Sequence, residues 1–430
     1  MTTSIAVIGA GSGYMPGVIR GLLHRAADLA GARLRFHDVD ADHLDVMTRL
    51  ARSMFAARGA DFTVTAHTDL KSALDGVDFV FTTFRPGGLR GRHLDESIPL
   101  RHGVVGQETV GPGGFFMACR SVPVLLDIAA VLAEAAPDAW IINYTNPTNV
   151  VTDAVSRHTG AKILGLCDQW VGDTETWADL LGLPVAGLEI DWIGTNHGTW
   201  AERVRLNGEP VDIAPLLEAV EPHGDATPHR DPVRMAELGK ALGLLVNSYA
   251  KYYFFHDEVV AQLRAKGTTR AEDIMAMLPA YYAQVAAEAD KPDPDPSRER
   301  GGGEHGEFAV DVICAIARDE QRRFIVNTRN RGAIASLEPD AIVEVPAVVG
   351  RQGAVPLVMG ELPRQVRGLT QAVHEYERLA ADAAVTGDRR TALRALLAHP
   401  FVSSLRVAER ILDEGLAAHR AHLPQFAQDR

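Results

Sequence analysis

The sequence predicts an α/β protein, with an N-terminal parallel sheet over residues 1–165 and a larger C-terminal α/β domain over residues 166–430. Three observations support this. Short apolar runs alternate with helical segments up to residue 165, a glycine-rich turn follows the first run, and longer helical segments separate the later strand candidates. Such alternation implies parallel strands joined by right-handed crossovers, and ligands bind such sheets at the carboxyl ends of the strands.

The expected elements follow one another along the chain. A helix is expected at residues 16–29, where proline suits the first turn and Gly31 ends the helix, and another at residues 41–58. Strands are expected at residues 5–8, 34–37, 62–66, 79–84, 140–143 and 162–165, and later at residues 188–193 and 342–349. Residues 291–296, Lys-Pro-Asp-Pro-Asp-Pro, cannot continue a helix and predict a solvated loop, which the glycines at 301–303 extend.

Charge and cysteine content exclude several classes of protein. The chain has 43 basic and 56 acidic residues, and its net charge of −13 argues against a general nucleic-acid or anionic-membrane surface. The three cysteines lie far apart and form no CxxC pair, so a reducing cytoplasm is expected. No signal peptide is visible, and charges such as Asp127 and Glu134 interrupt the longest apolar stretches, so no membrane span is expected.

A glycine-rich turn, Gly-Ala-Gly-Ser-Gly at residues 9–13, stands between the first strand and the first helix. Glycines there let backbone amides approach a pyrophosphate, and the helix N-terminus favours negative charge. Asp38 ends the second strand, where a carboxylate can bind a ribose hydroxyl pair. NAD is therefore expected, while Arg33 and Arg35 leave NADP open and an ordinary turn is the alternative. The expected cofactor-binding residues are Gly9, Gly11, Ser12, Gly13 and Asp38.

Four polar clusters stand where the predicted sheet would open into a cleft. They are residues 85–114, 143–149, 165–168 and 194–197. The first is predicted to be a long irregular segment, which in a compact domain is more often functional than idle. Cys167 and His197 each follow a predicted strand, and a thiolate with an imidazole could form an open transition-metal site. Each could equally be an ordinary buried side chain.

Together these motifs resemble glycoside hydrolase family 4, a family of NAD- and divalent-metal-dependent glycosidases. The motifs are GAGS at 9–12, FRPGGL at 84–89, DESIPL at 95–100, GQET at 106–109, NYTNP at 143–147, GLCD at 165–168, NH at 196–197, SYAKYYF at 248–254, GTTRAE at 267–272 and VNTRN at 326–330. Within the family the pattern looks most like the 6-phospho-β-glucosidases. The resemblance implies transient oxidation at sugar C3, removal of the C2 proton, elimination and addition of water.

The resemblance also implies roles for single residues. Tyr249 matches the family base, and Glu108 matches an acidic position that raises the basicity of that tyrosine. Cys167 and His197 match the ligands of a divalent ion, usually Mn²⁺. The matched substrate-binding positions are Arg92, Asn146 and Arg270. From the residues alone, Tyr249 could be a packed aromatic and each arginine could be paired with an acid.

Asp168 departs from the β-type pattern, which usually carries Asn after the metal cysteine. Asp is typical of the 6-phospho-α-glucosidases, where it donates a proton to the leaving oxygen; it could also cap a helix. The residues leave open an unphosphorylated glycoside as substrate, an NAD-dependent 2-hydroxy-acid dehydrogenase with a His base, and a non-catalytic nucleotide-binding sensor. The resemblance further implies a C-terminal domain of the lactate/malate dehydrogenase type, a phosphorylated disaccharide or glucoside as ligand, and a homodimer or homotetramer.

Overall fold

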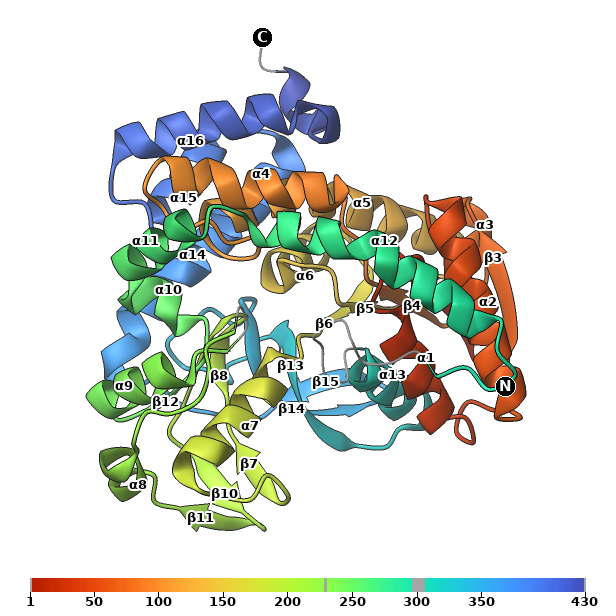
Figure 1. Cartoon of the computed structure of the whole chain (residues 1–430), viewed down its shortest axis with the longest axis horizontal. Coiled ribbons are helices and arrows are strands. Elements are labelled where there is room, and N and C mark those ends of the chain that lie inside the picture. Colours follow the sequence, from red (N-terminus) through yellow and green to blue (C-terminus); the bar gives the residue numbers. More distant parts are fainter. Residues whose placement is uncertain (1, 228–229, 296–305, 429–430) are drawn as a thin grey trace.

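A computed structural model describes residues 2–227, 230–295 and 306–428. Within these residues a 12-stranded sheet runs through the molecule in the order β12-β9-β8-β14-β13-β6-β5-β4-β1-β2-β3, with β15 beside β14. Helices cover both faces of this sheet (Figure 1). A separate three-stranded sheet has the order β11-β10-β7.

The N-terminal half of the sheet is parallel, as the strand–helix alternation predicts. All neighbours in the order β3-β2-β1-β4-β5-β6 pair in parallel register. These strands are β1 (Ser4–Ile8), β2 (Arg33–His37), β3 (Thr63–His67), β4 (Phe79–Thr82), β5 (Trp140–Asn143) and β6 (Lys162–Gly165). The helices between them include α1 (Met15–His24), α2 (Ala41–Ala57), α3 (Leu70–Leu74) and α6 (Thr148–His158).

The prediction of a long irregular segment at residues 85–114 is wrong. More than half of the segment is helical, because α4 spans Gly88–Arg101 and Gly111 already begins α5 (Gly111–Ala135). Its polar residues are held in the interior by ion pairs, since Arg120 of α5 binds Asp95 of α4 at 2.6 Å with both side chains fully buried. Pairing between the two helices thus overrides the weak helix propensity of the glycines and of Pro99.

Helix α5 bears on the prediction that the chain has no membrane span. Of the helices in the described residues, α5 alone has the length and apolar composition of a bilayer span, and 67% of its apolar window is buried inside the protein. The expectation that charges interrupt every such stretch therefore fails for α5. Its burial is that of a core helix, which passes the same test.

The C-terminal half extends the same sheet with antiparallel strands. β13 pairs with β6 at Asn327 and Gly165, and β14 lies between β13 and β8. The strands added to this sheet are β8 (Ile193–Thr195), β9 (Gly198–Ala201), β12 (Leu245–Val246), β13 (Arg322–Arg329), β14 (Ile342–Gly350) and β15 (Gly353–Pro356). The separate sheet consists of β7 (Leu188–Ile190), β10 (Val204–Leu206) and β11 (Glu209–Val211). The expected strand at 188–193 is thus divided between β7 and β8, which lie in different sheets.

Of the later helices, α11 to α16 pack back onto the N-terminal half. The helices are α7 (Gln169–Leu181), α8 (Ala214–Ala219), α9 (Pro232–Leu242), α10 (Ala250–Phe254), α11 (His256–Lys266), α12 (Arg270–Ala289), α13 (Glu307–Arg318), α14 (Arg364–Thr386), α15 (Arg389–Ala398) and α16 (Leu405–Ala418). Helix α12 lies along α2 and α4, and α13 packs against α1 (Figure 1). Residues 291–295 are non-helical as predicted, whereas Pro296 and the glycines at 301–303 lie outside the described residues.

Candidate active site

The glycine-rich turn joins β1 to α1 and closely approaches its neighbours. Gly9 has a left-handed φ of 92°, and a Cβ there would lie 2.5 Å from the carbonyl oxygen of Thr83. A Cβ on Gly11 would lie 2.9 Å from Oδ2 of Asp38, which accepts a hydrogen bond from the Gly11 amide at 2.7 Å. A larger residue at either position would force its neighbours to move, and the bond to Asp38 ties the turn to the end of β2.

Cys167 and His197 come together although 30 residues separate them. Cys167 follows β6, and His197 occupies the two-residue turn between β8 and β9 with a left-handed φ of 60°, uncommon for a non-glycine residue. The Cys167 Sγ lies 3.5 Å from the His197 Nε2, and both side chains are buried. A thiolate and an imidazole this close together could both bind a single divalent transition-metal ion. The pair therefore fits a metal site that keeps open positions.

Electrostatics around Cys167 also suit a cation. Burial raises the pKa of the Cys167 thiol well above its ordinary value, and the carboxylates of Glu344 and Asp168 raise it further. A divalent cation would reverse this balance because it stabilises the thiolate and both carboxylates.

Tyr249 lies directly on the same site. It precedes α10, and its ring stacks on the ring of His197 with centroids 4.0 Å apart and planes 4° apart. Burial raises the pKa of Tyr249 well above its ordinary value, followed by the effects of Tyr252, Cys167 and Glu108. The nearby Glu108 thus acts in the direction the resemblance implies, toward a more basic phenolate.

A network of buried charges surrounds Glu108. Arg92 of α4 binds Glu108 at 2.8 Å and Glu96 at 2.7 Å, and Arg85 also pairs with Glu108. Burial disfavours the charged form of Arg92, but the two acids outweigh this effect and raise its pKa. Arg92 is therefore a buried, acid-paired arginine and not one on a solvated face.

Glu96 connects this network to the start of α12. Its Oε2 accepts a hydrogen bond from the Ala271 amide at 3.0 Å. The preceding residue, Arg270, is the first residue of α12, which Thr269 and Glu272 begin with a capping box. Among the described residues, the buried Nε of Arg270 has no hydrogen-bond partner. The structure thus brings Arg92 and Arg270 to one charged region.

Asp168 and Asn146 stand at the ends of neighbouring parallel strands. Asp168 occupies the N-cap position of α7, but its side chain makes no capping hydrogen bond. Its charge acts on Tyr144, whose pKa is raised by burial first and by Asp168 second. Asn146 Oδ1 accepts a hydrogen bond from the Thr148 hydroxyl at 3.3 Å. The helix-capping interpretation of Asp168 therefore has no hydrogen bond to support it.

Two buried acids near the site lie outside the residues that the motifs point to. Glu344 on β14 accepts hydrogen bonds from Asn196 and Asn327, and burial raises its pKa to about 8. Asp173 on α7 accepts a hydrogen bond from Gln169, and burial raises its pKa to about 7. The sequence does contain a signal for Glu344, because a charged residue within the apolar run at 342–349 predicts a buried acid.

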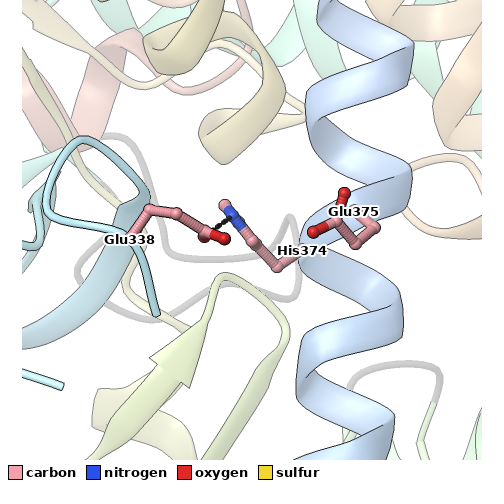
Figure 2. Close-up of side chains that lie close together, drawn as sticks. All are labelled: Glu338, His374 and Glu375. Carbon is pink, nitrogen blue, oxygen red and sulfur yellow. Dashed lines mark hydrogen bonds and ion pairs between the residues drawn. The ribbon is translucent and has the colours of Figure 1, made fainter. Parts of the chain in front are cut away.

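A second group of potential ligands draws on other elements. Glu338 lies on the loop before β14, and His374 and Glu375 lie on α14 (Figure 2). The His374 Nε2 is 3.0 Å from a Glu338 carboxylate oxygen, and the three ligand atoms lie within 4.8 Å of one another. Both glutamates are exposed, so a surface ion pair accounts for this group.

Comparison with known proteins finds matches along most of the chain. The profile of the family 4 glycosyl hydrolases matches residues 4–183, and that of the family 4 C-terminal domain matches residues 192–402. A probable 6-phospho-β-glucosidase of Bacillus subtilis is 37% identical, with 98% of this chain and 97% of the relative covered. A 6-phospho-α-glucosidase of Leptotrichia buccalis is 32% identical, with 98% of each chain covered.

Solved structures agree with these sequence matches. A Thermotoga maritima 6-phospho-β-glucosidase, solved with manganese, NAD⁺ and glucose-6-phosphate, has a TM-score of 0.86 at 28% identity, covering 98% of this chain and 99% of that one. Cryptosporidium parvum malate dehydrogenase has a TM-score of 0.55 at 15% identity, covering 90% and 99%, and so shares the fold. Because both profiles and full-length relatives match, the chain belongs to family 4 of the glycosyl hydrolases.

Proposed function

We propose that this chain hydrolyses 6-phospho-glucosides with NAD and a divalent metal, Mn²⁺ being the expected ion and β-glucosides the favoured substrates. The grouping of Cys167, His197 and Tyr249 carries the proposal. The Cys167 Sγ and His197 Nε2, two potential metal ligands, lie 3.5 Å apart, and the Tyr249 phenol stacks on the same imidazole. The B. subtilis relative named as a probable 6-phospho-β-glucosidase supports the substrate class.

NAD and the divalent ion would each supply one part of the chemistry, and residues of the chain would hold both. When bound, NAD accepts and returns a hydride at sugar C3, and the divalent ion acts as a Lewis acid on neighbouring oxygens. The turn at residues 9–13 with Asp38 would hold NAD, and Cys167 with His197 would hold the ion.

Tyr249 is proposed to take the C2 proton. Its hydroxyl is buried, so water competes poorly for the same proton transfer. The cation would lower the pKa of Tyr249, which burial and the neighbouring Tyr252, Cys167 and Glu108 raise. The negative charge of Glu108 acts against the cation: it raises the pKa of Tyr249 and so keeps the phenolate basic. After elimination, the protonated phenol can return the proton to C2 when water adds at C1.

The sugar phosphate is proposed to bind at Arg270 and Arg92, with Asn146 contacting the sugar. Arg270 offers a buried guanidinium nitrogen with no partner in the described chain, and a phosphate oxygen would satisfy it. Arg92 already binds two acids, so its contribution is a fixed positive charge within that network.

A 6-phospho-α-glucosidase is the second candidate, and Asp168 favours it. The Asp168 carboxyl is not committed to capping α7, and it interacts with Tyr144 at the end of β5. A carboxyl placed in this way can serve as a proton donor to a leaving oxygen. The relative from L. buccalis, named a 6-phospho-α-glucosidase, gives the same support from comparison.

One assay separates these candidates. Turnover of 4-nitrophenyl β-glucoside 6-phosphate is compared with that of the α-anomer and of both unphosphorylated glucosides, with Mn²⁺ and NAD present. Preference for the β-phosphate supports the proposal, and preference for the α-anomer supports the second candidate. Stoichiometric NADH accumulation without glucoside cleavage would instead indicate a dehydrogenase.

The organisation of the chain is part of the proposal. Residues 1–165 would form the NAD-binding unit and residues 166–430 the substrate, metal and oligomerisation unit. We propose a cytoplasmic homodimer or homotetramer, because closed symmetric dimers and tetramers are the commonest assemblies of soluble proteins. Sedimentation velocity at micromolar concentration tests the assembly state.

A further inference from the structure

Helix α12 contacts the glycine-rich turn through two adjacent tyrosines. The Tyr281 hydroxyl donates a hydrogen bond to the carbonyl oxygen of Gly13 at 2.9 Å, and the Tyr282 hydroxyl donates to that of Gly11 at 2.7 Å. More than 260 residues separate each tyrosine from its glycine. Neither tyrosine lies in a motif that carries the family resemblance.

These bonds lie on either side of one backbone amide. The amides of Gly9 and Ala10 bond to His37, the Ser12 amide bonds to Gly9, and the Gly11 amide bonds to Asp38. Within the described chain, the amide of Gly13 has no hydrogen-bond partner. This amide belongs to the peptide unit that joins Ser12 to Gly13. Tyr282 bonds to the carbonyl of the preceding peptide unit and Tyr281 to that of the following one. The orientation of the Gly13 amide is therefore set from both sides.

The ring of Tyr282 ties the turn to helix α2 as well. It stacks on the ring of His43 in α2, with centroids 3.8 Å apart and planes 14° apart. A Cβ on Gly11 would lie 3.0 Å from the His43 Cβ and 2.9 Å from the Asp38 Oδ2. The turn, the end of β2, α2 and α12 thus form one packed unit with little room for movement.

The N-terminal end of α12 is fixed at the charged region of the site. Its second residue, Ala271, donates its amide to Glu96, which also binds Arg92. Tyr282 is about 17 Å along the helix from Ala271 at 1.5 Å per residue. One continuous helix therefore connects the proposed phosphate region with the cofactor turn (Figure 1).

We propose that Tyr281 and Tyr282 are positioning residues that hold the turn with the Gly13 amide free for the NAD pyrophosphate. A turn that is already ordered loses less entropy on binding an anion, so the two hydroxyls raise the affinity for NAD without touching the substrate. This inference rests on the proposed use of NAD.

The test measures NAD binding to the NAD-stripped full-length protein by calorimetry, without substrate. Tyr281→Phe and Tyr282→Phe keep both rings and the stack on His43 but remove the hydroxyls. Each should raise the NAD Kd about 3- to 10-fold, the range of one lost hydrogen bond. In turnover assays the KM for NAD should rise while kcat at saturating NAD stays unchanged.

Tyr376→Phe is the matched control, because it removes a 2.8 Å hydrogen bond from a buried tyrosine to the Gly111 carbonyl, away from the turn. It should lower the melting temperature but leave the NAD Kd unchanged. Wild-type Kd values in both tyrosine variants, or an equal rise in Tyr376→Phe, would overturn the inference. If the wild-type protein bound no NAD, the proposed function would fail and this inference with it.

Discussion

The phenol ring of Tyr249 lies flat against the imidazole of His197, with centroids 4.0 Å apart and planes 4° apart. The Cys167 Sγ lies 3.5 Å from Nε2 of the same imidazole. A residue proposed to act as base and a residue proposed to bind the metal are therefore packed as one unit. Any charge placed at Nε2 is felt by the phenol at close range in a buried environment.

Metal dependence follows from this arrangement. Treatment with a chelator should abolish glucoside cleavage, and Mn²⁺ with a thiol reductant should restore it, because the Cys167 ligand must be reduced to bind. Cys167→Ser should require much more Mn²⁺ for half-maximal activity. Cys119→Ser is the control, since Cys119 is a buried free cysteine on helix α5. Full activity of Cys167→Ser after exhaustive chelation would exclude a metal at this site.

The phosphate requirement is best tested at Arg270. Removing Arg92 would leave the buried Glu96 without its cationic partner and Glu108 with Arg85 alone. The fold would be destabilised, so the effects on activity would be ambiguous. Arg270→Gln should raise the KM for a glucoside 6-phosphate about 10- to 100-fold, as expected for a lost hydrogen bond between charged groups.

The control for Arg270 is Arg264→Gln on α11, whose exposed guanidinium donates to the Leu100 carbonyl. It should leave the KM unchanged. Unphosphorylated glucosides should react poorly with the wild-type enzyme and with both variants. Equal turnover of phosphorylated and unphosphorylated glucosides by the wild-type enzyme would show that no phosphate site exists.

A pH dependence of stability follows from His399. Burial lowers the pKa of His399 to about 3, with a smaller effect from His256. Backbone amides of Gly111 and Phe401 point at the two ring nitrogens, which disfavours a protonated ring. Between pH 6.5 and pH 3 the unfolded chain therefore binds a proton at this residue that the folded chain does not, and stability falls as pH falls.

His399→Gln should remove this contribution. In urea titrations between pH 4 and pH 6, the free energy of unfolding should fall with decreasing pH less steeply than in the wild type, by about 1.4 kcal/mol per pH unit. His24→Gln, at an exposed position on α1, controls for loss of an imidazole. Identical slopes in His399→Gln and wild type would show that His399 titrates normally in the folded protein.

The sequence was sufficient for the parallel half of the fold. Strands β5 and β6 fall where their apolar runs predicted them, because a buried parallel strand needs apolar residues on both faces. The helix α4 could not be foreseen, since its stability comes from ion pairs such as Arg120 with Asp95 that only the folded chain brings together.

The candidate site was predicted from the motifs and not from the spacing of its residues. Spacing alone could not show that Cys167 would meet His197, because their contact depends on how β8 joins β14 and the rest of the sheet. The contacts of Tyr281 and Tyr282 with the glycine-rich turn were also beyond the sequence, since they depend on how α12 crosses α2. Roles inferred for single residues stay predictions.

The central claim is that Tyr249 removes the C2 proton, and hydrogen exchange at that carbon tests it most directly. Tyr249→Phe keeps the ring stacked on His197 and deletes only the hydroxyl, so the variant should fold and bind NAD. A general base contributes about 10²- to 10⁴-fold to the rate, and the variant should lose turnover on that order.

The measurement follows a glucoside 6-phosphate deuterated at C2 during turnover in ordinary water. With the wild-type enzyme, the account predicts a primary isotope effect or loss of the label to solvent. With Tyr249→Phe it predicts that label loss falls together with turnover, while the melting temperature stays close to that of the wild type. Near-normal turnover of Tyr249→Phe with undiminished exchange at C2 would contradict the account and direct attention to Tyr253.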